Sequence, residues 1–289
     1  MNEPSENKMD LITNRLTPER VNFFFNMRRA LLKPRTGWIN RGIYPGGLEI
    51  RFVRVEGQQR PKIQSFLRPY HAEPVSLHQN IVRLAAGHFG LSHSQYDLSE
   101  MSTHGEVHDL PEYKMPDWTP DDKIPKEHKV EREVALLYHI AASVPYGGEE
   151  ILRIGLDYVY QRTPEARIVK QLDKIDPAIR AMWYQLHFEE IERFYQDKDH
   201  PDHTKRREWL MQVEKFEGLT FEQRIPAIRE SLDEFFPYAR KKLEDPDLIN
   251  VYDIMMKNEH PEIDPFARYF ILLSSNGNEK VMKEFFQIM

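Results

Sequence analysis

Apolar residues recur at spacings of three and four along most of this chain, which is the period of an amphipathic α-helix. Such stripes run over 17–31, 75–89 and 126–144. A further helix should begin at Thr163 and Pro164, because threonine can cap the first backbone N–H groups and proline suits the first helical turn. The pattern predicts an all-α protein built by helix packing.

One segment departs from the helical period. Residues 44–72 contain alternating apolar and polar residues on both sides of a polar stretch, which predicts a small inserted β-hairpin. We expect this hairpin either near the mouth of a pocket, where it would affect which substrate enters, or at a dimer contact. The charged segment 197–206 is typical of a linker. The chain should therefore divide into a main domain over 15–196 and a C-terminal helical extension over 197–289.

Composition limits the classes of protein to which the chain could belong. Apolar residues make up 40% and charged residues 30%, and no run approaches the ~20 apolar residues that span a bilayer, so we expect no membrane association. The first ten residues lack a basic region followed by an apolar run, so we expect no signal peptide and a cytoplasmic location. The formal charge of −6 disfavours binding to a nucleic acid polymer.

The chain contains no cysteine, so a protein-bound metal would be held by histidine and carboxylate side chains. Such residues gather near the middle of the sequence. The adjacent pair His108 and Asp109 is followed by two more carboxylates, Glu112 and Asp117. Pro111 and Pro116 indicate that a helix ends near His108 to Glu112. This cluster is the strongest candidate for a catalytic or metal-binding site.

Two further residues extend the cluster from other parts of the chain. His78 lies beside the apolar face of the helix predicted over 75–89, and Asp173 lies at the edge of a later apolar stripe. An ionised carboxylate at that edge is costly unless it is paired or bound to a metal. With His108, Asp109, Glu112 and Asp117, these residues predict a mixed nitrogen and oxygen site for one divalent cation, which indicates a metal-assisted hydrolase.

Five motifs, in this order, resemble the HD-domain phosphohydrolase superfamily, and specifically its 5′-deoxynucleotidase-like branch. The motifs are PRTGW with Arg41 shortly after it, EPVSLH ending at His78, VHDLPE with Asp117 eight residues beyond Asp109, IPKEHK, and EARIVKQLD ending at Asp173. They span roughly Lys33 to Glu190. The resemblance implies an HD-domain helical bundle with a single divalent cation held by His78, His108, Asp109 and Asp173.

The resemblance also implies roles for four other residues. Glu112, one helical turn after Asp109, is suited to orient the attacking water or to take its proton. Asp117 would position the water or the leaving group, or contact the sugar hydroxyl. Arg35 resembles the phosphate-binding arginine of the family, because a guanidinium matches two phosphate oxygens. Trp38 resembles a tryptophan that contacts the sugar or the base.

We therefore expect a metal-dependent phosphomonoesterase that acts on nucleoside 5′-monophosphates, with deoxynucleosides favoured. The cation, which would be Mn, Co, Mg, Fe, Ni or Zn, would lower the pKa of a bound water towards ~7 and so generate the nucleophile. Two alternatives stay open, namely a nucleoside triphosphate hydrolase of the same superfamily and a non-catalytic nucleotide-binding HD protein. We expect a homo-oligomer, as a dimer, with a small phosphorylated nucleotide as the substrate.

Overall fold

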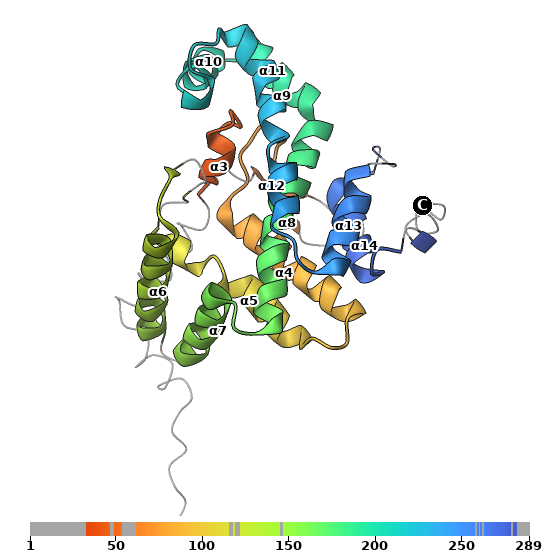
Figure 1. Ribbon diagram of the computed structural model, residues 1–289. Helices are drawn as coiled ribbons and strands as arrows, with labels where there is room; N and C mark the ends of the chain where they lie inside the picture. Colours follow the sequence, from red (N-terminus) through yellow and green to blue (C-terminus); the bar gives the residue numbers. More distant parts are fainter. Residues whose placement is uncertain are drawn as a thin grey trace, which may run out of the picture.

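The described part of the chain is helical apart from one pair of short strands (Figure 1). The computed structural model describes residues 33–46, 49–53, 62–115, 118, 122–144, 147–257, 259, 261, 263–278 and 280–281. The helix expected over 17–31 lies outside these residues. None of the described helices combines the length and the apolar character needed to cross a bilayer.

The helical elements surround one long central helix, α8 (Figure 1). In chain order they are α3 (Thr36–Ile39), α4 (Val75–Ser92), α5 (Leu98–Val107), the 3₁₀ turn η1 (Leu110–Tyr113), α6 (Lys126–Ser143), α7 (Gly148–Tyr160), α8 (Pro164–Leu186), α9 (Phe188–Gln196), α10 (His203–Met211), the 3₁₀ turn η3 (Glu214–Phe216), α11 (Phe221–Leu232), α12 (Phe235–Lys241), α13 (Pro246–Lys257) and α14 (Pro265–Ser274). Helices α4, α5, α7, α11, α12, α13 and α14 all contact α8. The prediction of an all-α bundle is confirmed for the described residues.

Helix α8 begins where the sequence predicts. The Thr163 hydroxyl accepts a hydrogen bond from the backbone N–H of Ala166 (3.1 Å), and Pro164 occupies the first turn. The helix then continues through Pro177 to its end at Leu186. Its length matters because it carries residues of the hydrophobic core on one face and residues of the candidate site on another.

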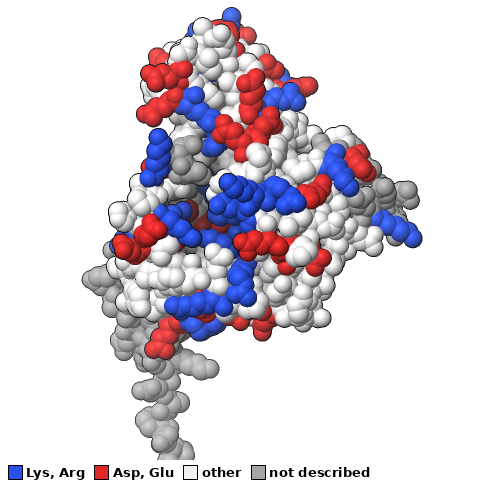
Figure 2. All heavy atoms as spheres, in the orientation of Figure 1, with Lys and Arg blue, Asp and Glu red and all other residues white. Residues whose placement is uncertain are grey.

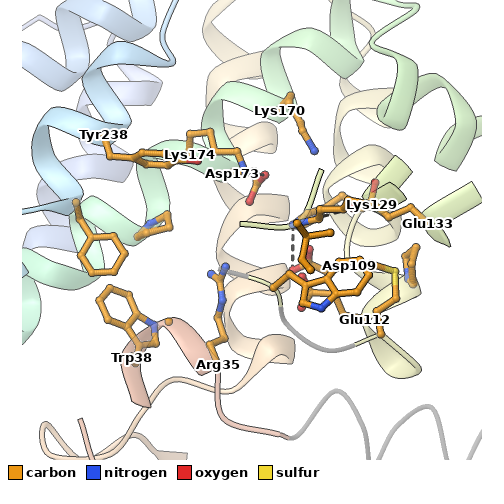
Figure 3. A pocket seen from close by; sticks show the side chains of 18 of the residues that line it. Arg35, Trp38, Asp109, Glu112, Lys129, Glu133, Lys170, Asp173, Lys174 and Tyr238 are labelled. Carbon is orange, nitrogen blue, oxygen red and sulfur yellow. Dashed lines mark hydrogen bonds and ion pairs between the residues drawn. The ribbon is translucent and has the colours of Figure 1, made fainter. Parts of the chain in front are cut away.

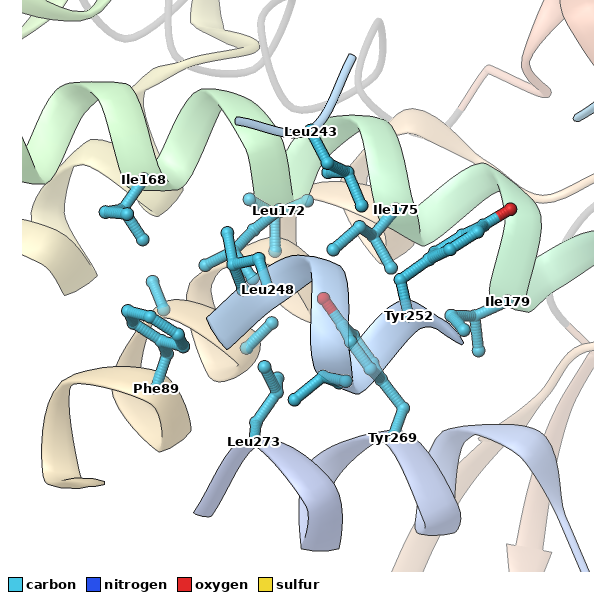
Figure 4. Close-up of a cluster of buried hydrophobic side chains, with 14 of the residues drawn as sticks. Phe89, Ile168, Leu172, Ile175, Ile179, Leu243, Leu248, Tyr252, Tyr269 and Leu273 are labelled. Atoms are coloured by element: carbon cyan, nitrogen blue, oxygen red, sulfur yellow. The ribbon is translucent and has the colours of Figure 1, made fainter. Parts of the chain in front are cut away.

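The larger hydrophobic core lies between α8, α4, α13 and α14 (Figure 4). Ile168, Leu172 and Ile175 of the predicted α8 stripe are buried here and meet Phe89 of α4 and Tyr269 of α14. Each fully buried side chain of this kind contributes about 1.5–3 kcal/mol. Two helices of the C-terminal region therefore share a core with the helices that carry the predicted site residues, although the boundary at residue 197 stays a prediction.

A second core joins the C-terminal half of α8 to α3, α9, α10 and α11. Its buried members include Trp38, Tyr184, Tyr195, Leu210 and Ile228. Phe216 and Phe221 of the C-terminal region are buried in the same core. The region expected over 197–289 is helical wherever it is described.

The segment 197–206 is not a simple linker, contrary to the prediction. Helix α10 begins within it at His203, and Arg206 is buried. The Arg206 guanidinium lies 3.9 Å from the centroid of the Phe194 ring and donates a hydrogen bond to the Phe194 carbonyl (3.0 Å). A long charged side chain can be buried when its charge meets a ring face and a carbonyl, and composition alone does not reveal such partners.

The N-terminal described segment is attached beside the start of α4. The backbone N–H of Arg35 donates to the Glu73 carbonyl (2.8 Å), and Pro34 forms a bridge with Pro74. This attachment places Arg35 and α3 close to the first turn of α4, which carries His78.

Within residues 44–72, strands β1 (Glu49–Val53) and β2 (Lys62–Phe66) pair antiparallel, with Glu49 opposite Phe66. The residues that connect the strands lie outside the described part of the chain, and the role of this segment stays a prediction.

Candidate metal centre

The structure brings together the four predicted metal ligands from three helical elements. His78 lies in the first turn of α4, His108 and Asp109 lie at the C-terminal end of α5, and Asp173 lies in the middle of α8. All four side chains are buried, and His78 is fully inaccessible. The Nε2 atom of His78 is 3.1 Å from Oδ1 of Asp173 and 3.6 Å from Oδ2 of Asp109, which in turn is 3.2 Å from Nε2 of His108.

Close packing of α4 on α5 makes this convergence possible. A Cβ atom on Gly105 would lie only 2.6 Å from the Cα atom of Arg83 on α4. A larger residue at this position would push the helices apart, and His108 follows only three residues later. Gly105 therefore helps to set the distance between His78 and the pair formed by His108 and Asp109.

Hydrogen bonds orient both imidazole rings. The Nδ1–H group of His108 donates to the Gly105 carbonyl (2.8 Å), and the Nδ1–H group of His78 donates to the Asp176 carboxylate. Each ring therefore directs its Nε2 atom towards the cluster. Partners of this kind fix the tautomer of metal-binding histidines and raise their basicity.

The donor set fits a divalent cation. Nitrogen and oxygen atoms bound to one cation at ~2.0–2.2 Å lie about 3 Å apart, and the separations of 3.1, 3.2 and 3.6 Å are close to this value. Nε2 of His108 and Oδ2 of Asp109 are buried and make no hydrogen bond to any described residue. Buried polar atoms left without such a partner are costly, and a cation would satisfy both.

The local electrostatic potential also favours a cation. Burial and the nearby Arg35 lower the pKa of His78, but the carboxylates of Asp176, Asp109 and Asp173 outweigh them and raise the pKa to about 10. Burial would raise the pKa of Asp109, but interaction with His108 holds it well below its usual value. The negative potential that stabilises a protonated imidazole at this point also stabilises a metal ion.

The two oxygens of Asp173 face different partners. Oδ2 accepts hydrogen bonds from the Tyr158 hydroxyl (2.9 Å) and from the Lys174 ammonium (2.8 Å), while Oδ1 faces His78. Burial opposes ionisation, yet Lys174 and His78 hold the pKa of Asp173 well below its usual value. Asp173 is therefore a charged carboxylate with one oxygen directed at the cluster.

A cavity of about 530 Å³ opens over this cluster, within the size range of small-molecule sites (Figure 3). His108, Asp109 and Asp173 line its floor, and the predicted site residues Arg35 and Glu112 line its walls. Figure 3 shows the Arg35 guanidinium directed towards the space beside Asp109 and Asp173. The backbone N–H of Glu112 donates to the Asp109 carbonyl (3.0 Å), which ties Glu112 to the floor.

Two other predicted residues behave differently. Trp38 lines the cavity but is only 2% exposed, because its ring packs against two others. The distance between ring centroids is 4.4 Å to Phe235 and 5.1 Å to Tyr184. Trp38 is thus first of all a core residue with one edge at the cavity. Asp117 lies outside the described residues, and its role stays a prediction.

Several basic side chains of the cavity were not predicted as site residues. Lys129 of α6 and Lys170 and Lys174 of α8 line the same space (Figure 3), and Lys and Arg side chains gather around a hollow on this face of the molecule (Figure 2). Burial and the neighbouring Lys174 lower the pKa of Lys170 to about 8. Helical spacing was an available signal, because Lys170 lies three residues before Asp173 and four residues before Lys174.

A buried polar network behind the cluster was also missed. Asp176 is 1% exposed and accepts a hydrogen bond from His78 in the first turn of α4. Both Nε and Nη2 of Arg180 donate to Oε1 of Glu73 (3.1 and 2.8 Å). Asp173, Asp176 and Arg180 follow one another at spacings of three and four on α8, so one row of that helix supports the first turn of α4.

Comparison with known proteins assigns the chain to a family. Residues 58–213, more than half of the chain, match the family model described as the HD domain. The chain belongs to this family, and the predicted membership is confirmed.

The most similar curated relatives include three vertebrate proteins named 5′-deoxynucleotidase HDDC2. The Danio rerio protein is 26% identical over 53% of this chain and 62% of its own length, and the Homo sapiens protein is 26% identical over 53% and 61%. The Mus musculus protein is 28% identical over 47% of this chain and 69% of its own length. The chain thus spans about three fifths of the length of the zebrafish and human relatives.

Proposed function

We propose that this protein is a metal-dependent phosphohydrolase that removes phosphate from nucleoside 5′-monophosphates, with deoxynucleosides favoured. The observation that carries the proposal is the position of the buried His and Asp cluster at the floor of a cavity whose walls bear basic side chains. The family membership and the names of the relatives support the same reaction class.

In this proposal His78, His108, Asp109 and Asp173 hold one divalent cation. When bound, such a cation would supply Lewis-acid activation of water and would neutralise charge on the phosphoryl oxygens. Asp176 and the Gly105 carbonyl keep the two imidazoles in the tautomer that presents Nε2.

The remaining residues bind the substrate and move protons. Arg35 binds the phosphate with its planar guanidinium, and Lys129 and Lys170 add positive charge from the opposite wall. Glu112 takes the proton of the attacking water as the new P–O bond forms. The bond between phosphorus and the 5′ oxygen breaks, and the leaving 5′ alkoxide takes up the proton that Glu112 removed from the water, which gives the nucleoside. Asp117 keeps its predicted role beside the water, the leaving group or the sugar hydroxyl.

One observation favours a second candidate, a nucleoside triphosphate hydrolase. The cavity is lined by six basic residues, which is more positive charge than one phosphate requires: Arg35, Arg41, Lys126, Lys129, Lys170 and Lys174. Carboxylates of the same cavity offset part of this charge, among them Glu133 and Glu234. We therefore keep the monophosphate as the proposed substrate. Analysis of the products separates the two reactions.

The test is a substrate panel with the purified protein. Deoxynucleoside and ribonucleoside mono- and triphosphates would be incubated with Mn, Co or Mg, and the products would be separated by ion-exchange chromatography. Inorganic phosphate released from monophosphates is the expected result. Tripolyphosphate released from triphosphates would establish the second candidate. No turnover with any metal would contradict both and would favour a nucleotide-binding protein without catalysis.

A further inference from the structure

One wall of the cavity is built by segments outside the family match at 58–213. Trp38 of α3 and Phe235 and Tyr238 of α12 line this wall. In Figure 3, Tyr238 and Trp38 lie on one side of the cavity, Glu112 and Glu133 lie on the opposite side, and Asp173 lies between them. Trp38, Phe235 and Tyr238 therefore form an aromatic wall, although Tyr158 and Trp118 also line the cavity.

Contacts with neighbouring elements hold α12 in place against α3. The Arg41 guanidinium lies 4.5 Å from the centroid of the Phe235 ring and donates to Glu234 (3.2 Å). Lys215 also donates to Glu234 (2.9 Å), and the Phe235 ring packs on Trp38. These contacts fix the backbone that carries Tyr238, so the wall is organised before any ligand binds.

Tyr238 differs from its aromatic neighbours in this wall. Phe235 and Trp38 pack against each other in the second core, whereas Tyr238 is 39% exposed on the next turn of α12. An aromatic ring that lines a cavity and keeps part of its surface accessible can stack on a flat ligand. In Figure 3, Lys174 lies between Tyr238 and Asp173, which places the ring beyond the charged groups of the floor.

We propose that Tyr238 is a specificity-determining residue that stacks on the nucleobase of the substrate. The inference rests on the proposed function and extends it, because it identifies where the part of the substrate remote from the phosphate binds. With the phosphate at the floor beside Asp173, the flat, uncharged base would reach the α12 wall, where Tyr238 lies beyond Lys174. The base would thus be recognised by a segment that the family match does not include.

The test compares two substrates that share the phosphate and the sugar. Tyr238→Ala should lower kcat/KM for a deoxynucleoside 5′-monophosphate by about 5- to 150-fold, the usual effect of removing one stacking ring, mainly by raising KM. The effect on deoxyribose 5-phosphate, which has no base, should be much smaller. Tyr238→Phe keeps the ring and should retain the preference for the nucleotide.

Tyr160→Ala is the matched control, because Tyr160 is 49% exposed on α7 and does not line the cavity. It should leave both substrates unaffected. Equal effects of Tyr238→Ala on the two substrates, whether absent or large, would overturn the proposal. Circular dichroism and thermal unfolding of each variant would show that the fold is intact.

Binding of a deoxynucleoside, which carries a base but no phosphate, separates this proposal from the proposed function. Isothermal titration calorimetry should show weaker binding to Tyr238→Ala than to the wild type, even if the protein hydrolyses no substrate. Unchanged deoxynucleoside affinity would refute the role of Tyr238. Wild-type protein that binds the deoxynucleoside but releases no phosphate would refute only the proposed function.

Discussion

The floor and the aromatic wall of the same cavity are built in opposite ways. The floor consists of polar side chains that are buried because other polar groups orient them, as Asp176 orients His78. The wall consists of aromatic side chains that form part of a hydrophobic core and present one edge or face to the cavity, as Trp38 and Phe235 do. Changes at the floor leave buried polar groups without partners, whereas changes at the wall alter shape and stacking.

Because of this difference, substitutions at the floor should affect the reaction itself, and substitutions at the wall should affect which substrate binds. A floor residue has partners on several elements, so its replacement should remove the metal or the chemistry altogether. In the proposed function a wall residue would contact only the ligand on the side that faces the cavity, so its replacement should change affinity by a graded amount.

Removal of a floor carboxylate should have the largest effect. In Asp109→Ala, His78 and His108 lose the oxygen that lies 3.6 and 3.2 Å from their Nε2 atoms, so we expect loss of bound metal and a fall in kcat/KM of more than about 1,000-fold. Metal content would be measured by inductively coupled plasma mass spectrometry. Asp199→Ala, at an exposed turn, is the control and should keep both metal and activity.

Replacement of Glu112 should separate the chemistry from metal binding. Glu112 lines the cavity next to the floor but is not part of the His and Asp cluster. In Glu112→Gln we expect full metal content and a fall in kcat of about 100- to 10,000-fold, the usual contribution of a general base. Metal loss equal to that of Asp109→Ala would show that Glu112 is a ligand and would contradict the proposed role.

Replacement of a residue behind the floor should have an intermediate effect. Asp176→Asn removes the charged acceptor of the His78 Nδ1–H group, so we expect metal affinity to fall by about 10- to 100-fold. The measurement is calorimetric titration with Mn or Co. Asp247→Asn is a matched control, because it changes another His and Asp pair, His93 Nε2 to Asp247 Oδ2 at 3.1 Å, away from the cavity. Equal losses in both variants would indicate general destabilisation.

The sequence could predict the features that depend on neighbouring residues but not those that depend on how distant helices pack. The helix start at Thr163 and the apolar stripe of α8 were predictable because capping and periodicity are local properties. The meeting of His78, His108, Asp109 and Asp173 was predictable only through their order in motifs, since distant residues carry no local signal of contact. The support of His78 by Asp176 depends on how α4 lies on α8, and this required the structure.

The aromatic wall was missed for a related reason. Phe235 and Tyr238 resemble ordinary residues of an amphipathic helix, and nothing in their spacing indicates that α12 packs beside α3. Trp38 shows the converse problem. Its motif predicts a ligand contact, but only 2% of its surface is exposed, so packing against other side chains dominates its environment.

The smallest effect should come from a basic residue that lines the cavity outside the aromatic wall. Lys170 lines the cavity, and burial with the neighbouring Lys174 lowers its pKa to about 8. Below that pH the ammonium is charged and attracts the substrate phosphate, and above it the charge is lost. We therefore expect KM to rise by about tenfold as the pH increases through 8, close to the lower limit of ~1.5 kcal/mol for a hydrogen bond to a charged group.

The pH profile of kcat/KM in two variants tests this assignment. Lys170→Arg stays charged over the whole range, so its KM should not rise near pH 8. Lys170→Met should show the high KM at every pH. Lys205→Met, on an exposed part of α10, is the control and should keep the wild-type profile. A KM rise near pH 8 that persists in Lys170→Arg would assign the titration to another group and would remove Lys170 from phosphate binding.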